Sequence, residues 1–355
     1  MKTTLLLLFC SLLGIRNAAA QTDTDSRIER AIEQMDGGHF DEAARLLRTV
    51  LAEDPKNFTA NYEMGFLLYQ QERYAESVEV LRRLKRKDYP PLYQMLGNAY
   101  DMAGDRKRAV KTYKEGLKHN PDAGRLYLEL GNIAYAEGQY DRALGYYRTG
   151  ATVDPAHASN YRSQALLYAT STEPVWALVW GEMFMNRERG SRRTSDMSRK
   201  LGEIYRNNIV IESDSAVRVT FSRNQRISQE GFRLRIPFGT AVFEVGVLAA
   251  LTADGIPDSL TLAVLSDMRE RFVDTYFEKY DRMLLDDDAV RPLMAYQRRV
   301  KEAGMMRPYT YWVLSQGFPE EFDRWRDAHP RQWSEFIEWF TANPMPVPRF
   351  ESSSE

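Results

Sequence analysis

The apolar positions of residues 24–190 recur with the three-to-four-residue spacing of amphipathic helices, and glycine or proline separates one helix from the next. Around Gly97 and Gly131, which lie 34 residues apart, the same residue types return at the same offsets. Tyr93, Leu96, Asn98, Arg108, Ala109, Tyr113 and Pro121 reappear as Tyr127, Leu130, Asn132, Arg142, Ala143, Tyr147 and Pro155. This period predicts a stack of similar helical hairpins.

The order of residues within the period resembles the tetratricopeptide repeat (TPR), a helix-turn-helix of this length. Two antiparallel helices approach closely only where side chains are small, so Gly97 and Ala109 are expected at the contact, with Tyr113 filling the space beside it. Weaker copies cover about residues 24–57, then a shorter unit that closes at Pro90, then a degenerate unit that continues to about residue 190. The resemblance implies about five units over residues 24–190, forming a right-handed TPR α-solenoid.

A two-residue period replaces the helical one after a last amphipathic helix that runs through about Tyr205. Apolar residues alternate with polar ones at Val217, Val219 and Phe221, and again at Phe232, Leu234, Ile236 and Phe238. We predict one β-hairpin near residues 217–238, with an apolar face that packs against helices. Six helices are predicted to follow, over residues 240–253, 258–280, 290–303, 309–316, 319–327 and 331–343. A mostly helical C-terminal domain thus covers residues 195–343, and residues 344–355 are expected to form a loose tail.

The first 20 residues have the features of a cleavable signal peptide. Lys2 precedes a mostly apolar run over residues 5–13, and three alanines precede Gln21. The run is too short for a membrane span, and no later stretch has the length and apolarity of a transmembrane helix. Lipid attachment at Cys10 is the weaker alternative, because Phe9 stands where a lipoprotein signal carries a small residue. We expect cleavage near Ala20–Gln21 and a periplasmic or other cell-envelope location.

Composition excludes several kinds of site. Cleavage would remove Cys10, the single cysteine, so the mature chain would contain neither a disulfide nor a thiolate metal ligand. It would also leave 46 basic and 50 acidic residues, which disfavours a general polyanion binder. The four histidines, His39, His119, His157 and His329, are scattered, and none has a second ligand at a metal-binding spacing. We therefore predict no metal and no cofactor.

Three charged segments have ordinary explanations. The densest basic run, residues 82–87, and the run 106–108 are predicted to be a solvated outer face rather than a nucleic-acid site, with an anionic lipid or glycan surface as the alternative. The acidic residues 286–288 are predicted to precede a helix, whose dipole favours them there. Asp327 and His329 are the nearest approach to an acid–base pair, and the aromatic residues around them have the rhythm of a core.

The resemblance to TPR proteins implies where a partner binds. Such stacks mostly bind peptides or proteins along the concave surface, which is lined by the first helix of each unit. In this sequence that surface would present Tyr62, Phe66, Tyr69, Gln94, Asn98, Asp101, Leu128, Asn132, Tyr135 and Arg162. Aromatic and amide side chains suit an extended polypeptide, although Tyr62 and Phe66 could instead only pack against neighbouring units or the C-terminal domain. Gln94 and Leu128 stand where the carboxylate-clamp members carry lysine, which argues against binding of chaperone tails.

The sequence as a whole predicts a non-enzymatic scaffold or adaptor that binds a partner polypeptide in the TPR groove. The C-terminal domain would cover the apolar edge of the last unit or hold a second partner. One alternative is a hydrolase-like enzyme with its active site in the C-terminal domain, and another is a structural subunit of an envelope complex. Neither the partner nor the oligomeric state is specified by the sequence.

Overall fold

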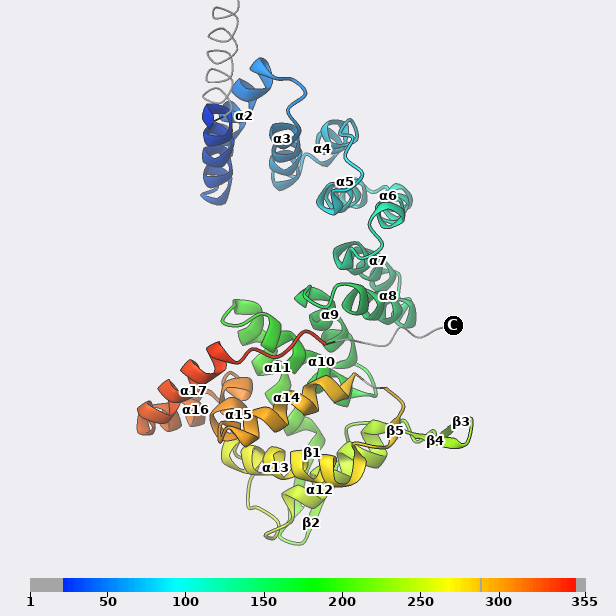
Figure 1. Ribbon diagram of the computed structural model, residues 1–355, viewed down its shortest axis with the longest axis vertical. Helices are drawn as coiled ribbons and strands as arrows, with labels where there is room; N and C mark the ends of the chain where they lie inside the picture. The colour runs from blue at the N-terminus through cyan, green and yellow to red at the C-terminus, as the bar shows by residue number, and fades with distance from the viewer. Residues whose placement is uncertain (1–21, 288, 349–355) are drawn as a thin grey trace, which may run out of the picture. The chain divides into compact units, whose positions relative to one another are not determined.

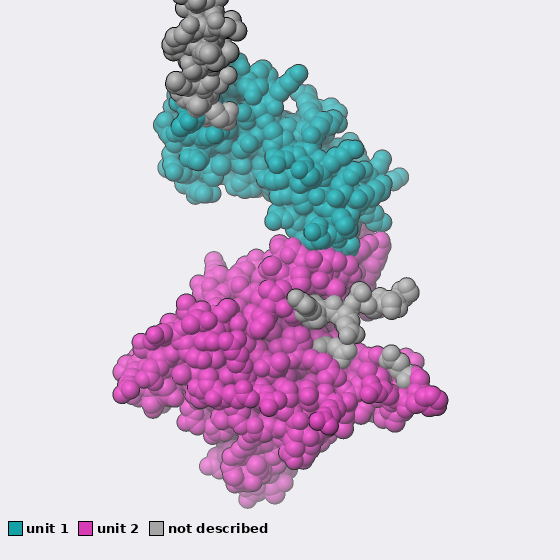
Figure 2. Space-filling view, in the orientation of Figure 1, with its two compact units in different colours: residues 1–133 teal, residues 134–355 magenta. Residues whose placement is uncertain are grey.

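A computed structural model describes residues 22–287 and 289–348. The chain divides into two compact units, Met1–Ile133 and Ala134–Glu355, coloured teal and magenta in Figure 2. Both units are mostly helical. In the described part of the chain, no helix is both long enough and apolar enough to cross a membrane.

Unit 1 consists of consecutive helical hairpins (Figure 1). The helices are one that ends at residue 36, α2 (Phe40–Glu53), α3 (Phe58–Gln70), α4 (Tyr74–Leu81), α5 (Pro90–Met102), α6 (Arg106–His119) and α7 (Gly124–Ala136), within which unit 2 begins. Gly38 and Gly104 have positive φ angles and close the turns between paired helices, a conformation that glycine adopts without strain. The observed helices confirm the hairpin units predicted from the 34-residue period.

Contacts between paired helices in unit 1 depend on small residues. A Cβ atom on Gly97 of α5 would lie only 2.1 Å from Cε1 of Tyr113 on α6, far inside van der Waals contact. Ala109 and Tyr113 are both buried. Gly65 of α3 lies in the same way against Leu81 of α4. The predicted roles of Gly97, Ala109 and Tyr113 are confirmed.

Unit 2 begins with further hairpin helices and continues into a larger helical body. Its elements after α7 are α8 (Tyr140–Val153), α9 (Ala158–Tyr168), α10 (Pro174–Arg187), α11 (Arg192–Asn208), β1 (Ile209–Ser213), β2 (Ala216–Val219), β3 (Ser228–Glu230), β4 (Arg233–Ile236), η1 (Phe238–Glu244), α12 (Val245–Leu251), α13 (Leu262–Thr275), η2 (Tyr276–Tyr280), β5 (Leu284–Leu285), α14 (Val290–Glu302), α15 (Met306–Leu314), α16 (Pro319–Ala328) and α17 (Pro330–Ala342). The two η segments are π-helices that continue directly into or out of α-helices. The six predicted C-terminal helices are therefore present, with two of them partly π-helical.

Helix α10 is the centre of unit 2. Every residue from Val175 to Asn186 is buried, and the helix contacts α9, α11, η1 and α14. One apolar core runs from Ala151 of α8 to Met345 near the end of the described chain. Within the described residues, the last hairpin helices and the C-terminal helices therefore contribute to one shared core.

Strand pairing differs from the single predicted hairpin. Strand β2 pairs with β1, which continues directly from α11, whereas β4 pairs antiparallel with β3 and parallel with β5. The segments 217–221 and 232–238 thus do not pair with each other. The physical reason is the length of the connections. The observed partners are joined by two-residue turns, at Asp214–Ser215 and Gly231–Phe232, whereas a much longer loop joins the predicted partners and costs more entropy to close.

The apolar face predicted for the strands is only partly buried. Phe221 and Phe238 are buried, and Val217 and Val219 pack against the core. Phe232 and Leu234, however, are exposed. The tail differs as well, because Met345 is buried in the core, so the predicted loose tail is packed at least this far. Residues 349–355 lie outside the described residues, as does the predicted signal peptide.

Candidate binding surface on the first helices of the repeats

A carboxylate held by amides links α5 to α7 in unit 1. Gln94 Nε2 donates a hydrogen bond of 2.7 Å to Glu129 Oε1, and Asn132 Nδ2 donates one of 3.0 Å to Oε2 of the same residue. Arg125 Nη1 in turn donates to Gln94 Oε1 at 3.3 Å. No cation of the described chain lies within ion-pair distance of Glu129, so its charge is met only by neutral donors.

Two tyrosines lie close enough to this carboxylate for its charge to raise the pKa of their hydroxyl groups. Burial raises the pKa of Tyr69, and Tyr74, Glu129 and Asp101 raise it further. Burial also raises the pKa of Tyr113, and here Glu129 makes the largest electrostatic contribution. The Tyr113 hydroxyl donates to Asn98 Oδ1 at 2.6 Å.

Asp101 completes the group from the C-terminal end of α5. Unlike Glu129, it has a cation partner, Arg106, whose Nε lies 3.0 Å from its Oδ1. We call the group formed by Tyr69, Gln94, Asn98, Asp101, Tyr113, Glu129 and Asn132 the acidic cluster. It brings together side chains from α3, α5, α6 and α7.

The predicted residues nearer the N-terminus are partly structural. Tyr62 lies against Phe58 and Tyr89, with ring centroids 6.3 and 5.6 Å away, and burial raises its pKa to about 12. Phe66 packs against the core formed by the first three helices of unit 1. Both side chains are half-buried, so the packing alternative considered for them holds for part of each surface. Leu128, in α7, is also half-buried.

Two of the predicted residues belong to unit 2. Tyr135 is 52% exposed, and its ring centroid lies 5.6 Å from that of Tyr140. Arg162 lines a hollow of about 200 Å³ between α9 and α11, together with Leu166 and Lys200. Burial lowers the pKa of Arg162, and the nearby Arg193 lowers it further.

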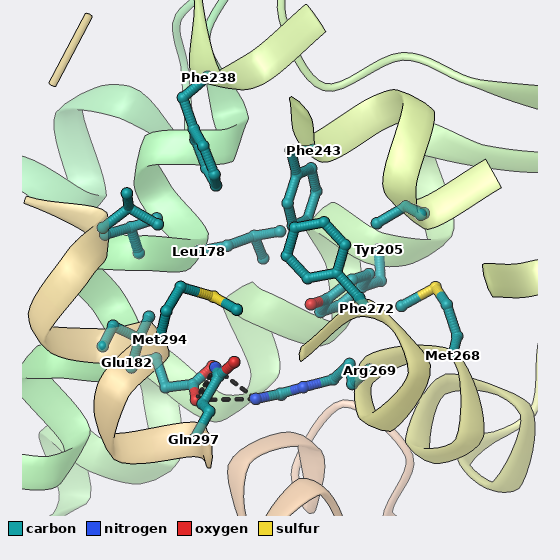
Figure 3. Close-up of a pocket in the computed structure, with 14 residues that line it drawn as sticks. Leu178, Glu182, Tyr205, Phe238, Phe243, Met268, Arg269, Phe272, Met294 and Gln297 are labelled. Atoms are coloured by element: carbon teal, nitrogen blue, oxygen red, sulfur yellow. Dashed lines mark hydrogen bonds and ion pairs between the residues drawn. The ribbon is translucent and has the colours of Figure 1, made fainter. Parts of the chain in front are cut away.

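The largest buried polar cluster among the described residues lies inside unit 2 (Figure 3). Glu182 of α10 accepts hydrogen bonds from Arg269 Nη2 at 2.7 and 2.8 Å, from Gln297 Nε2 at 2.7 Å and from the Tyr309 hydroxyl at 2.8 Å. Beside it is a cavity of about 30 Å³, lined mostly by apolar side chains such as Phe243 and Phe272. This space fits water but no larger substrate, so the cluster is best explained as a structural ion pair.

The remaining candidates do not form reactive sites. His329 stacks on Trp325 at 5.2 Å, while Asp327 pairs with Arg326 at 3.3 Å, so the two do not form an acid–base pair. Within residues 22–287 and 289–348, no three His, Cys, Asp or Glu side chains could hold a metal ion. The basic runs are exposed, as predicted, and include ion pairs with acids on the same helices, such as Arg82 with Glu79.

Asp286 and Asp287 precede α14, as predicted, and they also bind groups from other segments of unit 2. Asp286 accepts from the backbone N–H of Phe238 at 2.8 Å and from Asn224 Nδ2 at 2.9 Å. Asp287 accepts from Arg148 and from the backbone N–H of Ala289. They therefore connect distant segments of unit 2, in addition to standing before the helix, and no side chain caps α14. Asp288 lies outside the described residues.

Comparison with known proteins identifies the repeats. Residues 34–99 and 95–167 match two models described as tetratricopeptide repeat. The chain is 27% identical over 112 residues to mouse tetratricopeptide repeat protein 21B, a match that covers 31% of this chain and 8% of the mouse protein. It is 24% identical over 133 residues to the TPR repeat-containing protein YpiA of Bacillus subtilis, covering 37% of this chain and 31% of that protein. The chain therefore spans less than a third of either relative.

Among solved structures, the chain is similar to TTC0263, a thermophilic TPR protein of Thermus thermophilus. That match has a TM-score of 0.44 and 17% sequence identity, and it covers 50% of this chain and 98% of TTC0263.

Proposed function

We propose that this chain, whose residues 34–167 are tetratricopeptide repeats, is a non-enzymatic scaffold or adaptor that binds a partner polypeptide through the first helices of unit 1. Proteins with these repeats are generally interaction scaffolds for proteins or peptides, and they are typically not enzymes. The acidic cluster is the part of the surface that supports this function best.

The observation that carries the proposal is the state of Glu129. Its two oxygens accept hydrogen bonds from Gln94 and Asn132, which fix the carboxylate in place, while no cation of the described residues neutralises it. A partly buried carboxylate in such surroundings gains most from a cationic partner, because charge-assisted hydrogen bonds are stronger than neutral ones. We therefore propose that the partner carries a lysine or arginine that contacts Glu129.

The side chains around Glu129 suit the rest of such a partner. Tyr69 supplies an aromatic surface for the aliphatic stem of the basic side chain or for its cation. Amide groups such as Asn98 offer hydrogen bonds to the backbone of an extended peptide. The proposed ligand is thus an extended polypeptide segment with a basic residue among apolar ones.

Synthetic peptides test this preference directly. Extended peptides that differ only by lysine or glutamine at one position are titrated against the intact protein and against Glu129→Gln, which keeps the shape of the side chain and removes its charge. Loss of a charge-assisted hydrogen bond should weaken binding of the lysine peptide about tenfold or more and leave the glutamine peptide unchanged. Glu115→Gln, on the outer helix α6, is the matched control. Equal binding of both peptides by the intact protein would refute the basic preference.

Cross-linking in cells tests the surface itself. The intact protein is compared with a variant in which Tyr62, Tyr69, Asn98, Asn132 and Tyr135 are alanine, after circular dichroism has established that the variant is folded. A partner that cross-links to the intact protein and not to the variant supports the proposed surface. A partner whose capture survives all five substitutions contacts another part of the chain.

We also propose that the protein is exported and works in the cell envelope, with cleavage between Ala20 and Gln21. The support is the charged start, apolar run and small residues of the first 20 positions. Mass spectrometry of the protein recovered from cells should give Gln21 as the first residue. An unprocessed N-terminus, or lipid attached at Cys10, would contradict this cleavage.

A further inference from the structure

The β3–β4 hairpin presents uncovered apolar side chains in unit 2. Phe232, in the two-residue turn, is fully exposed, and Leu234 and Ile227 are each 60% exposed. In Figure 1 the hairpin projects from the helices of unit 2. Large apolar side chains gathered in this way on a projecting segment indicate a contact surface.

The strand register places these apolar side chains on one face. Gln229 pairs with Leu234, so the two lie on the same face, and alternation along β4 puts Ile236 on that face as well. Arg233 and Arg235 belong to the opposite face, because side chains alternate along a strand. The hairpin is therefore mostly apolar on one face and at its turn, and its other face carries Arg233 and Arg235, which pair with Glu230 and Ser228.

The hairpin also carries unneutralised positive charge. Segment 223–235 contains four arginines and one acidic residue. Arg223, Arg226 and Arg233 are exposed, and none of them forms an ion pair with any residue in the described ranges. An anionic surface is the complement of these guanidinium groups.

The base of the hairpin is firmly held, so the turn is presented rather than loosely attached. Arg235 Nη1 donates to the carbonyl of Leu285 at 2.7 Å, and β4 pairs with β5. The Asp286 backbone N–H donates to the carbonyl of Ile236 at 2.9 Å, and the Asp286 side chain accepts from Phe238 and Asn224. A fixed base lets the turn meet a surface without first losing conformational freedom.

We propose that the β3–β4 hairpin docks on an anionic phospholipid bilayer. Phe232 and Leu234 enter the membrane–water interface, and the exposed arginines described above, Arg223, Arg226 and Arg233, contact lipid phosphates. The exposed apolar set is small, whereas a stable protein interface buries about 800 Å² on each partner. A bilayer needs no complementary pocket and combines apolar insertion with attraction of basic residues, which matches this hairpin. Pairing with a second copy through β3 is less suited, since this edge strand has only three residues.

Vesicle flotation tests the proposal with the full chain. Vesicles of phosphatidylcholine alone are compared with an equimolar mixture of phosphatidylcholine and phosphatidylglycerol. We expect binding to the mixed vesicles to weaken about tenfold or more in Phe232→Ser, from the lost apolar burial. Arg226→Gln and Arg233→Gln should each weaken it about fivefold, and added salt should weaken it further.

Matched controls separate the hairpin from general effects. Val245→Ser removes an exposed apolar side chain of α12, and Arg192→Gln removes an exposed arginine of α11, so neither should change binding. The apolar run of residues 5–13 is common to every variant, so differences between variants do not arise from it. Melting curves that match the wild type establish that each variant retains the fold.

A label at the turn gives a second readout. A fluorophore on Phe232→Cys, in a Cys10→Ser background, should be quenched by lipids brominated in their acyl chains. Absence of quenching, or equal vesicle binding by Phe232→Ser and wild type, would overturn the proposal. So would a dimer or an acidic protein complex that forms without vesicles and is lost in Phe232→Ser, because the face would then be a protein interface.

Discussion

At the scale of single residues, the carboxylate of the buried ion pair in unit 2 accepts hydrogen bonds from three side chains. Arg269, Gln297 and Tyr309 all donate to Glu182, and Glu182 and Arg269 are both buried. Removing one member leaves the opposite charge buried without its counter-charge, which is more destabilising than removing both.

Arg269→Leu should therefore lower the free energy of unfolding of unit 2 by about 3–5 kcal/mol. All six tryptophans lie in unit 2, so tryptophan fluorescence during urea unfolding follows this unit specifically. The double variant Glu182→Leu/Arg269→Leu should recover part of the loss. A single variant as stable as wild type would show that the pair contributes nothing.

Tyr205 makes unit 2 sensitive to alkaline pH. Burial raises its pKa to about 12, with Arg269 lowering it and Glu182 raising it. The folded-state pKa exceeds the unfolded value near 10. The contribution of the neutral Tyr205 side chain to the stability of unit 2 is therefore complete below pH 10 and is lost as the pH rises toward 12. The loss should be on the order of 3 kcal/mol, and Tyr205→Phe should make the decline in stability across this range shallower. Denaturation by urea at several alkaline pH values, followed by tryptophan fluorescence, measures both.

At the scale of secondary-structure elements, helix pairing depends on where a side chain is absent. In Gly97→Ala the new Cβ would meet the Tyr113 ring at 2.1 Å, so the helices α5 and α6 must separate or the ring must move. We expect a loss of about 1–3 kcal/mol. Gly145→Ala, in α8, places its Cβ in open space and should instead stabilise by up to about 1 kcal/mol. Thermal melting by circular dichroism, with hydrogen exchange to locate the change, distinguishes the two outcomes.

Elements were predictable from sequence where one local pattern determines them. Gly97, Ala109 and Tyr113 repeat because each hairpin has the same internal contact, so the period alone gives the helices. Strand partners were not predictable in this way, because alternation at Val217 and Leu234 identifies strands without saying which strand lies beside which. The same limit explains why an apolar face at Phe232 was expected to be covered.

The candidate site was predictable only in part. Asn98 and Asn132 were identified from their places in the repeat, but Glu129 was not, because a glutamate in a helix has the same sequence pattern whether it is solvated or bound. The role of Glu129 depends on the hydrogen bond that it accepts from Gln94, which lies 35 positions away on another helix. Contacts of that separation follow from the stacking of units, which no single repeat encodes.

At the scale of the whole chain, α10 determines what can be removed. A chain that ends after residue 194 lacks η1, α14 and most of α11, which cover α10 in the structure. Burial of each large apolar side chain stabilises the fold by about 1.5–3 kcal/mol. The loss from exposing several of them is as large as the roughly 5–15 kcal/mol by which a domain is normally stable. The truncated chain should aggregate or melt at a lower temperature. A monomeric truncated chain with unchanged melting, judged by gel filtration and circular dichroism, would contradict the covering role proposed for residues 195–343.

The single core of unit 2 also bears on how the chain folds while the ribosome is making it. Hairpins of unit 1 pack mainly on helices close in sequence, so each can form soon after it emerges. The core of unit 2 includes Met345, and Tyr296 donates to the carbonyl of Asn343, so its packing is complete only after residue 345 has been synthesised. Until then α10 would expose its apolar residues, and it is at this stage that a nascent chain most needs a chaperone.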